Sequence, residues 1–139
     1  MRSFRSVMLA VAAVVAACST GPSPFEPSGP PGVDLRATPG MVAVGSTVRL
    51  SLTNSSSAVI IVRPCPLSLE HWNGFSWDLV GDGSGSCAGI EDTLATGGEA
   101  DVVKELNVAQ GLYRAVIEIH NLGTTSMAGV YSNTFSVTQ

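Results

Sequence analysis

Apolar and polar residues alternate along much of the chain from Val33 to Gln139, and this spacing restricts the possible folds more than any other feature. In residues 47–52 every second side chain is apolar, and residues 112–119 continue the pattern through Tyr113, Ala115, Ile117 and Ile119. Successive side chains of a strand point to opposite faces, so this period of two indicates strands with one buried face. No segment keeps a helical period over about ten residues. Clusters of turn-forming residues recur about every 8–12 residues, so we predict an all-β antiparallel sandwich.

The first 17 residues follow a different pattern. Arg2 and Arg5 precede eleven uninterrupted apolar residues, 7–17. A positive start, a short apolar run and small residues before a cleavage point are typical of a secretory signal peptide. The run is shorter than the roughly 18 residues of a membrane-spanning helix. We therefore predict that residues 1–17 are a signal peptide.

The end of this run, "VAAC" at residues 15–18, resembles the lipobox of bacterial lipoproteins. The resemblance implies that the Cys18 thiol carries diacylglycerol, that the chain is cut before Cys18, and that the new amine is acylated. Fatty acyl chains would then anchor the protein in a membrane. Ser19 replaces the Asp that retains some lipoproteins at an inner membrane, so the cell envelope is expected, and the outer membrane where the cell has one. Val15 and Ala17 also suit an ordinary signal peptidase, which is the alternative.

A linker is expected between the lipidated cysteine and the domain, over residues 18–32. Residues 19–32 contain five Pro, three Gly and one large apolar side chain, Phe25. Proline removes backbone donors and favours an extended chain. Fourteen residues at about 3.1 Å each would reach roughly 40 Å, so we predict a semi-rigid spacer followed by one domain, residues 33–139.

The three cysteines fit an exported protein with one disulfide. If Cys18 carries lipid, Cys65 and Cys87 remain as a pair in an oxidising compartment. A bridge between them would close about 23 residues and stabilise the fold by roughly 3 kcal/mol in the chain-entropy model. It requires Cα atoms within about 7 Å. Two free buried thiols are the alternative.

Residues 67–80, "LSLEHWNGFSWDLV", predict a β-hairpin, and its loop length decides which side chains are buried. A two-residue loop at Asn73-Gly74 would send the leucines of one strand and the apolar residues of the other to opposite faces. A three-residue loop, 72–74, with Gly74 in a left-handed conformation brings all of them to one face. The pairs expected from it are His71 with Phe75, Leu69 with Trp77, and Leu67 with Leu79.

The three-residue loop places Trp72 outside the buried face of the hairpin. An exposed tryptophan is a candidate contact residue, so we predict contacts at Trp72 and Asn73. Half-burial of Trp72 by a neighbouring loop is the alternative.

Four stretches resemble the bacterial immunoglobulin-like domains of uncharacterised exported lipoproteins: "VGSTVRLSLTNSSS", "LSLEHWNGFSW", "GLYRAVIEI" and "YSNTFSV". The resemblance covers roughly residues 33–139 and implies an immunoglobulin-like antiparallel β-sandwich. The spacing from Leu106 to Tyr113 resembles a tyrosine corner, in which the hydroxyl bonds to upstream backbone. A distant likeness to a bacterial intracellular proteinase inhibitor implies the same sandwich, although the signal peptide argues against an intracellular location.

The remaining polar residues offer weak candidate sites. His71 and His120 are the only histidines, too few for a typical zinc site, so no metal is expected there. The acidic loop 81–92 departs from a calcium-binding EF-hand because Cys87 and Thr93 stand where Gly and Glu are needed. A solvated loop is expected, with an irregular calcium site as the alternative.

Charge and motifs limit the possible functions. Only seven Lys and Arg stand against eleven Asp and Glu, which excludes a nucleic-acid footprint. No nucleophile elbow is present and no cofactor is implied. We predict a non-catalytic, membrane-anchored binding or structural module of the envelope, whose partner is an envelope protein or a glycan. The alternative is a protease-inhibitor-like domain. A rigid exposed loop with a protruding apolar residue would favour the inhibitor, and a flat or concave patch the module.

Overall fold

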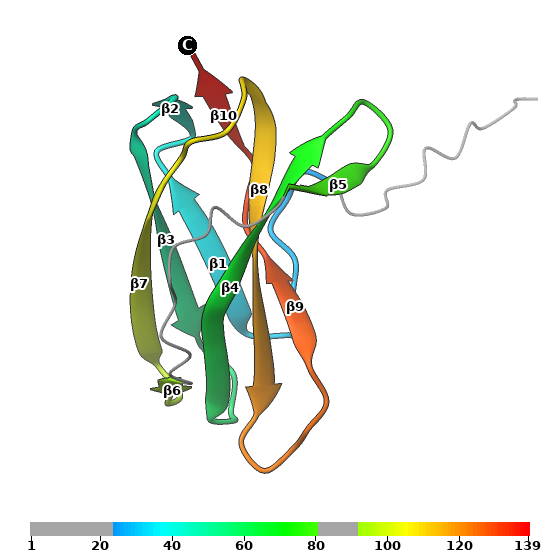
Figure 1. Cartoon of the computed structure of the whole chain (residues 1–139). Coiled ribbons are helices and arrows are strands. Elements are labelled where there is room, and N and C mark those ends of the chain that lie inside the picture. The colour runs from blue at the N-terminus through cyan, green and yellow to red at the C-terminus, as the bar shows by residue number, and fades with distance from the viewer. Residues whose placement is uncertain (1–23, 81–91) are drawn as a thin grey trace, which may run out of the picture.

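The computed structural model describes residues 24–80 and 92–139, and in these ranges the chain forms ten strands and no helix (Figure 1). None of the described residues therefore forms a helix that could cross a bilayer. The strands are β1 (Val33–Thr38), β2 (Met41–Ala43), β3 (Thr47–Asn54), β4 (Ile60–Trp72), β5 (Trp77–Val80), β6 (Asp92–Leu94), β7 (Gly98–Glu105), β8 (Gly111–Asn121), β9 (Ala128–Tyr131) and β10 (Phe135–Thr138).

Two sheets face each other as an immunoglobulin-like sandwich. One sheet has the order β1-β3-β7, and the other has the order β2-β10-β8-β4-β5, with β6 paired to β4 and β9 paired to β8. The pairings are antiparallel except for β2 and β10, which run parallel. The predicted all-β antiparallel sandwich is confirmed.

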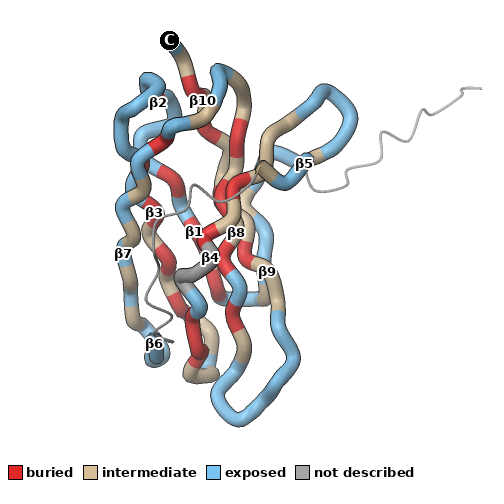
Figure 2. Tube along the Cα trace, in the orientation of Figure 1, coloured by how far each residue is buried: buried red, intermediate tan, exposed pale blue. Residues whose placement is uncertain are grey.

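The core lies between the two sheets and follows the alternation of the sequence. From one sheet, β3 contributes Leu50 and Leu52, and from the other, β8 contributes Ile117 and Ile119. The intervening residues of both strands are less buried, so the buried positions form lines along the facing strands (Figure 2). Burying each of these side chains contributes about 1.5–3 kcal/mol, which makes the inter-sheet contact the main source of stability.

Strand β4 is long and irregular in its middle. Its register with β8 shifts between Arg63 and Ser68, a stretch that contains Pro64 and Pro66. Proline has no N–H to donate to the ladder, so two prolines explain a break in the pairing there.

The predicted disulfide and lipid site cannot be placed on this fold. Cys65 lies within the irregular stretch of β4, but its side chain is not described. Cys18, Cys87, the signal peptide and residues 81–91 of the acidic loop lie outside the described residues. The bridge, the lipidation and the calcium alternative stay predictions.

The β4–β5 hairpin differs from the expected register. Trp72 pairs with Trp77 and His71 with Asp78, so the loop has four residues, 73–76, and both shorter loops are wrong. The predicted left-handed Gly74 is present, with a φ of 102°.

The changed register reverses the faces of β5. Leu67 and Leu69 are buried as expected, but Phe75 is 95% exposed and Leu79 is 70% exposed. In β5, Val80 packs against the core instead. The expected register assumed that all apolar side chains of the hairpin seek the core, whereas β5 is an edge strand with a second packing surface on its outer face.

Leu50→Ala should lower the free energy of unfolding by about 2–5 kcal/mol, because Leu50 is fully buried between the sheets. Leu79→Ala removes the same atoms from an exposed position and should change it by no more than about 0.5 kcal/mol. Urea denaturation of both variants measures the difference. A large loss for Leu79→Ala would contradict the register of the hairpin.

Candidate functional site

Aromatic and charged side chains gather on the outer face of the sheet formed by β4, β5, β8 and β9. Trp72 pairs across strands with Trp77, and Glu70, two residues before Trp72, pairs with Arg114. Tyr131 of β9 pairs with Val116, two residues after Arg114. Residues two apart share a face of a strand, and residues paired across strands lie on the same face. This register therefore brings all of these side chains to the outer face of the sheet. We call Trp72, Trp77, Arg114 and Tyr131 the aromatic surface.

The rings of the aromatic surface contact one another through two kinds of interaction. The centroids of Trp72 and Trp77 lie 5.3 Å apart with the rings tilted by 55°. The guanidinium of Arg114 lies 4.4 Å from the centroid of Trp77 and 4.4 Å from that of Tyr131. A guanidinium at this distance from a ring face is attracted by the quadrupole of the ring. Arg114 thus connects the hairpin to β9.

Glu70 holds the guanidinium in place. Arg114 Nε donates a hydrogen bond of 2.6 Å to Glu70 Oε2, and Arg114 Nη2 lies 2.6 Å from the same oxygen. The two side chains are only 15% and 19% exposed, so water screens this ion pair less than one on the open surface. The pair fixes the orientation of Arg114 between the two rings.

The end of the predicted linker lies against this surface. The ring of Phe25 meets Trp72 edge-on at 5.3 Å and Trp77 at 6.2 Å between centroids. Trp77 Nε1 donates a 3.2 Å hydrogen bond to the carbonyl oxygen of Pro24. The backbone of Ser28 pairs with Tyr131 through bonds of 3.0 and 2.6 Å. Residues 24–28, expected to belong to a spacer, therefore contact the domain, and only 19–23 separate them from Cys18.

The tip of the hairpin is held by the side chain of Asn73. Its Oδ1 accepts hydrogen bonds of 2.9 Å from the backbone N–H groups of Phe75 and Ser76. Its Nδ2 donates to Ser76 Oγ at 3.0 Å and to Asp78 Oδ2 at 2.8 Å. An Asn side chain that bonds the backbone two and three residues ahead replaces a tight turn, which explains the four-residue loop.

The predicted contact residues have different positions in this site. Trp72 is half-buried and belongs to the aromatic surface, whereas Asn73 is exposed and its side chain bonds within its own loop. Phe75 protrudes beside it, and Figure 1 shows the loop projecting from the body of the sandwich. Sequence reasoning missed Phe25, Trp77, Arg114 and Tyr131 as surface residues.

Tyr113 has the geometry of a tyrosine corner. Its hydroxyl donates a 2.7 Å hydrogen bond to the carbonyl oxygen of Ala109, upstream of β8. Burial raises the pKa of this hydroxyl above its usual value. The contact orders the turn before β8.

Both histidines make local contacts. The ring of His71 lies 4.9 Å from that of Tyr113, and Nδ1 of His120 lies 2.8 Å from the carbonyl oxygen of Thr124. In residues 24–80 and 92–139, no group of three or more His, Cys, Asp and Glu is placed to hold a metal ion.

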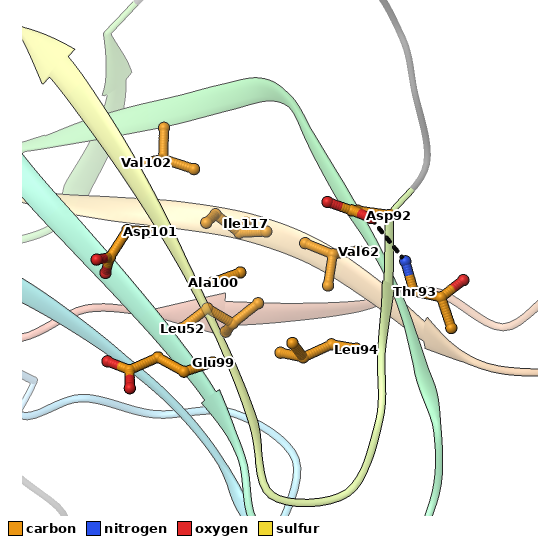
Figure 3. A pocket seen from close by; sticks show the side chains of 10 residues that line it. All are labelled: Leu52, Val62, Asp92, Thr93, Leu94, Glu99, Ala100, Asp101, Val102 and Ile117. Carbon is orange, nitrogen blue, oxygen red and sulfur yellow. Dashed lines mark hydrogen bonds between the residues drawn. The ribbon is translucent and has the colours of Figure 1, made fainter.

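A cavity of about 350 Å³ opens between the sheets near β6 and β7 (Figure 3). Its lining is mostly apolar and includes Leu52, Val62 and Ile117. Asp101, at its rim, accepts a hydrogen bond from Ser51 and lies 3.8 Å from an Arg49 nitrogen. Four polar residues also line it, namely Asp92, Thr93, Glu99 and Asp101. In the described part of the chain these carboxylates are not placed together as a metal-binding group.

No protein-family model matches this chain, and no curated protein matches it either. Among solved structures, the chain is similar to the ASH / PapD-like domain 7 of human CEP192, with 18% identity, 96% of this chain and 97% of that chain covered, and a TM-score of 0.43.

Two longer proteins show partial similarity. One is the Pseudomonas fluorescens alkylpurine DNA glycosylase AlkC bound to DNA containing an abasic site analog, with 12% identity, 76% of this chain covered and a TM-score of 0.42. The other is a β-glucosidase from Listeria innocua in complex with gluconolactone, with 17% identity, 74% of this chain covered and a TM-score of 0.31. The chain spans only 29% and 16% of those proteins. Such low identities and TM-scores say nothing about what this chain binds.

Trp72→Ala and Trp77→Ala should lower the free energy of unfolding by amounts that do not add, because each substitution removes the same ring contact. We expect a coupling energy of about 0.5–1.5 kcal/mol from chemical denaturation of the two single variants and the double variant. If the two losses of unfolding free energy add within experimental error, the contact between the two rings does not stabilise the fold.

Proposed function

We propose that this protein is a lipid-anchored, non-catalytic module of the bacterial cell envelope that binds a partner through the aromatic surface. The aromatic surface is the observation that supports a binding role. Its rings and the guanidinium of Arg114 are already held in position in the protein without a partner. Tryptophan, tyrosine and arginine are the residues most enriched among those that dominate binding energy in interfaces. The support for the anchor is the lipobox resemblance at residues 15–18 and the apolar run before it.

Positioned side chains favour binding because less conformational entropy is lost when a partner arrives. Arg114 is held by an ion pair with Glu70 and by two rings, and Trp72 is held by Trp77. The two histidines are engaged in local contacts, so a binding role accounts for the described side chains better than acid–base chemistry does.

A protease-inhibitor-like role is the second candidate, and one observation favours it. Phe75 is 95% exposed at the tip of a loop that Asn73 holds through four side-chain hydrogen bonds. A rigid loop with a protruding apolar residue can occupy a hydrolase cleft at a low entropic cost. Tyr131 of the aromatic surface lies on β9, whereas Phe75 lies in the loop of the β4–β5 hairpin, so substitutions at these two residues can separate the two roles.

Replacing Cys18 with Ala should release the protein from the membrane, because the thiol is the proposed attachment point of the lipid. Detergent phase partition of the full chain expressed in a bacterial host measures the release, and mass spectrometry of the N-terminal peptide measures the added lipid. Ser19→Ala is the matched control and should remain in the detergent phase. The anchor is ruled out if Cys18→Ala partitions like the parent and the parent peptide carries no lipid mass.

Two variants distinguish binding through the aromatic surface from inhibition through the loop tip. Tyr131→Ala removes a ring that contacts Arg114, and Phe75→Ala removes the protruding side chain. The assay is capture of a partner from detergent-solubilised envelope by the parent protein and by each variant. If the aromatic surface is the binding site, Tyr131→Ala loses the partner and Phe75→Ala retains it. The measurement is the amount of co-purified partner relative to the parent.

A protease-inhibitor-like role predicts the opposite pattern for the two variants. Exported proteases of the host would then be inhibited by the parent and by Tyr131→Ala, and Phe75→Ala would raise the inhibition constant at least about tenfold. Chemical denaturation of both variants serves as the control for folding. Loss of capture with Phe75→Ala and full capture with Tyr131→Ala would contradict the aromatic surface as the binding site.

A further inference from the structure

The aromatic surface already holds a peptide in this structure, because the chain's own residues 24–28 lie on it. The Phe25 ring contacts both tryptophans, and the Phe25 carbonyl oxygen accepts a 3.3 Å hydrogen bond from the backbone N–H of Thr134. Trp77 Nε1 binds the carbonyl oxygen of Pro24, and Ser28 pairs with the backbone of Tyr131. The segment is thus held at three points along its length.

These contacts define what the surface recognises. Besides the ring of Phe25, the segment is held through the carbonyl oxygens of Pro24 and Phe25 and the backbone of Ser28. Pro24 and Pro27 lack N–H groups, so the segment has fewer backbone donors that need a partner. Aromatic rings that line a binding site are a common means of recognising proline-rich peptides. Pro24 and Phe25 lie in a turn and Glu26 in a bend, so the surface fits a turn-forming segment with an aromatic residue next to proline.

The chain's own segment covers the surface only in part. Phe25 remains 37% exposed on it. Leu79, which pairs with Glu70 and so lies on the same face as Trp77, is 70% exposed. A larger ligand that also contacts Leu79 would bury more apolar area than the residues of the chain itself.

We infer that the aromatic surface is a docking site for a turn-forming proline-aromatic peptide of a partner protein, and that residues 24–28 occupy it as an internal ligand. This inference rests on the proposed function, since it names the class of partner for the same surface. The internal ligand competes with the partner because its attachment to the domain gives it a high effective concentration. The partner peptide must displace Phe25 before it can bind.

Phe25→Ala in the full chain should open the site to a peptide added from solution. The probe is the synthetic peptide SPFEPSG, which has the sequence of residues 23–29. Trp72 and Trp77 are the only tryptophans of the chain, so tryptophan fluorescence reports directly on the site. We expect half-saturation of Phe25→Ala at a peptide concentration at least about tenfold lower than for the parent.

Two controls test the specificity of this response. The peptide SPAEPSG lacks the aromatic ring and should bind Phe25→Ala at least about tenfold more weakly than SPFEPSG. Tyr131→Ala combined with Phe25→Ala should weaken binding of SPFEPSG, whereas Val103→Ala, at an exposed position of β7 in the other sheet, should not. Equal responses to the two peptides, or no saturable response of Phe25→Ala at several millimolar peptide, would overturn the inference.

A failure of the inference can be told apart from a failure of the proposed function. If a soluble oligosaccharide saturates the fluorescence change and SPFEPSG does not, the surface binds a glycan and the peptide assignment is wrong. If SPFEPSG fails while the envelope partner is still lost with Tyr131→Ala, only the ligand class is wrong. If the envelope capture also shows no dependence on Tyr131, the binding role of the surface is wrong as well.

Discussion

The cross-strand pairing of Trp72 with Trp77 determines which side chains of the β4–β5 hairpin face the core and which face outward. A slip of one residue in a hairpin moves every side chain of one strand to the opposite face. With the observed pairing, Val80 reaches the core and Trp77 lies outside, where it meets Trp72 and Arg114. The aromatic surface exists because of this register.

Asn73 explains why the register takes this form. A four-residue loop leaves backbone N–H groups at its tip without ladder partners. The side-chain Oδ1 of Asn73 accepts hydrogen bonds from two of these N–H groups. The same side chain bonds Asp78 at the start of β5, so the loop and the edge strand are fixed together. One polar side chain at the tip thus maintains both the outward aromatic face and the exposed position of Phe75.

The sequence predicts the features of this protein that depend on local alternation. Buried positions such as Leu50 and Ile117 follow from the period of two. The hydrogen bond of Tyr113 to upstream backbone is what the resemblance of the Leu106 to Tyr113 spacing to a tyrosine corner implies. The predicted hairpin register is wrong because it assigns every apolar residue to a single core. Phe75 and Leu79 do not obey that rule, since an edge strand has an outer face with its own neighbours.

The aromatic surface depends on contacts between residues that are distant in the sequence, and alternation alone does not reveal such contacts. Arg114 meets Glu70 across 44 positions, and Trp77 meets Pro24 across 53. A proline-rich stretch with a single large apolar residue has the composition of a free linker. Here the ring of Phe25 packs on two indole rings, and backbone hydrogen bonds of Pro24, Phe25 and Ser28 hold the stretch on the domain as well.

If Cys18 carries the proposed lipid, the docked segment limits how far the domain can stand from it. With residues 24–28 on the aromatic surface, only the five residues 19–23 lie between Cys18 and the first contact, and a fully extended chain of that length spans at most about 18 Å. If a partner peptide displaces Phe25 and Ser28, the connecting chain lengthens to residue 32 and reaches roughly 40 Å. Under the proposed function, occupation of one surface would therefore set both what the module binds and how far from the membrane it binds, because the same segment would serve as internal ligand and as tether.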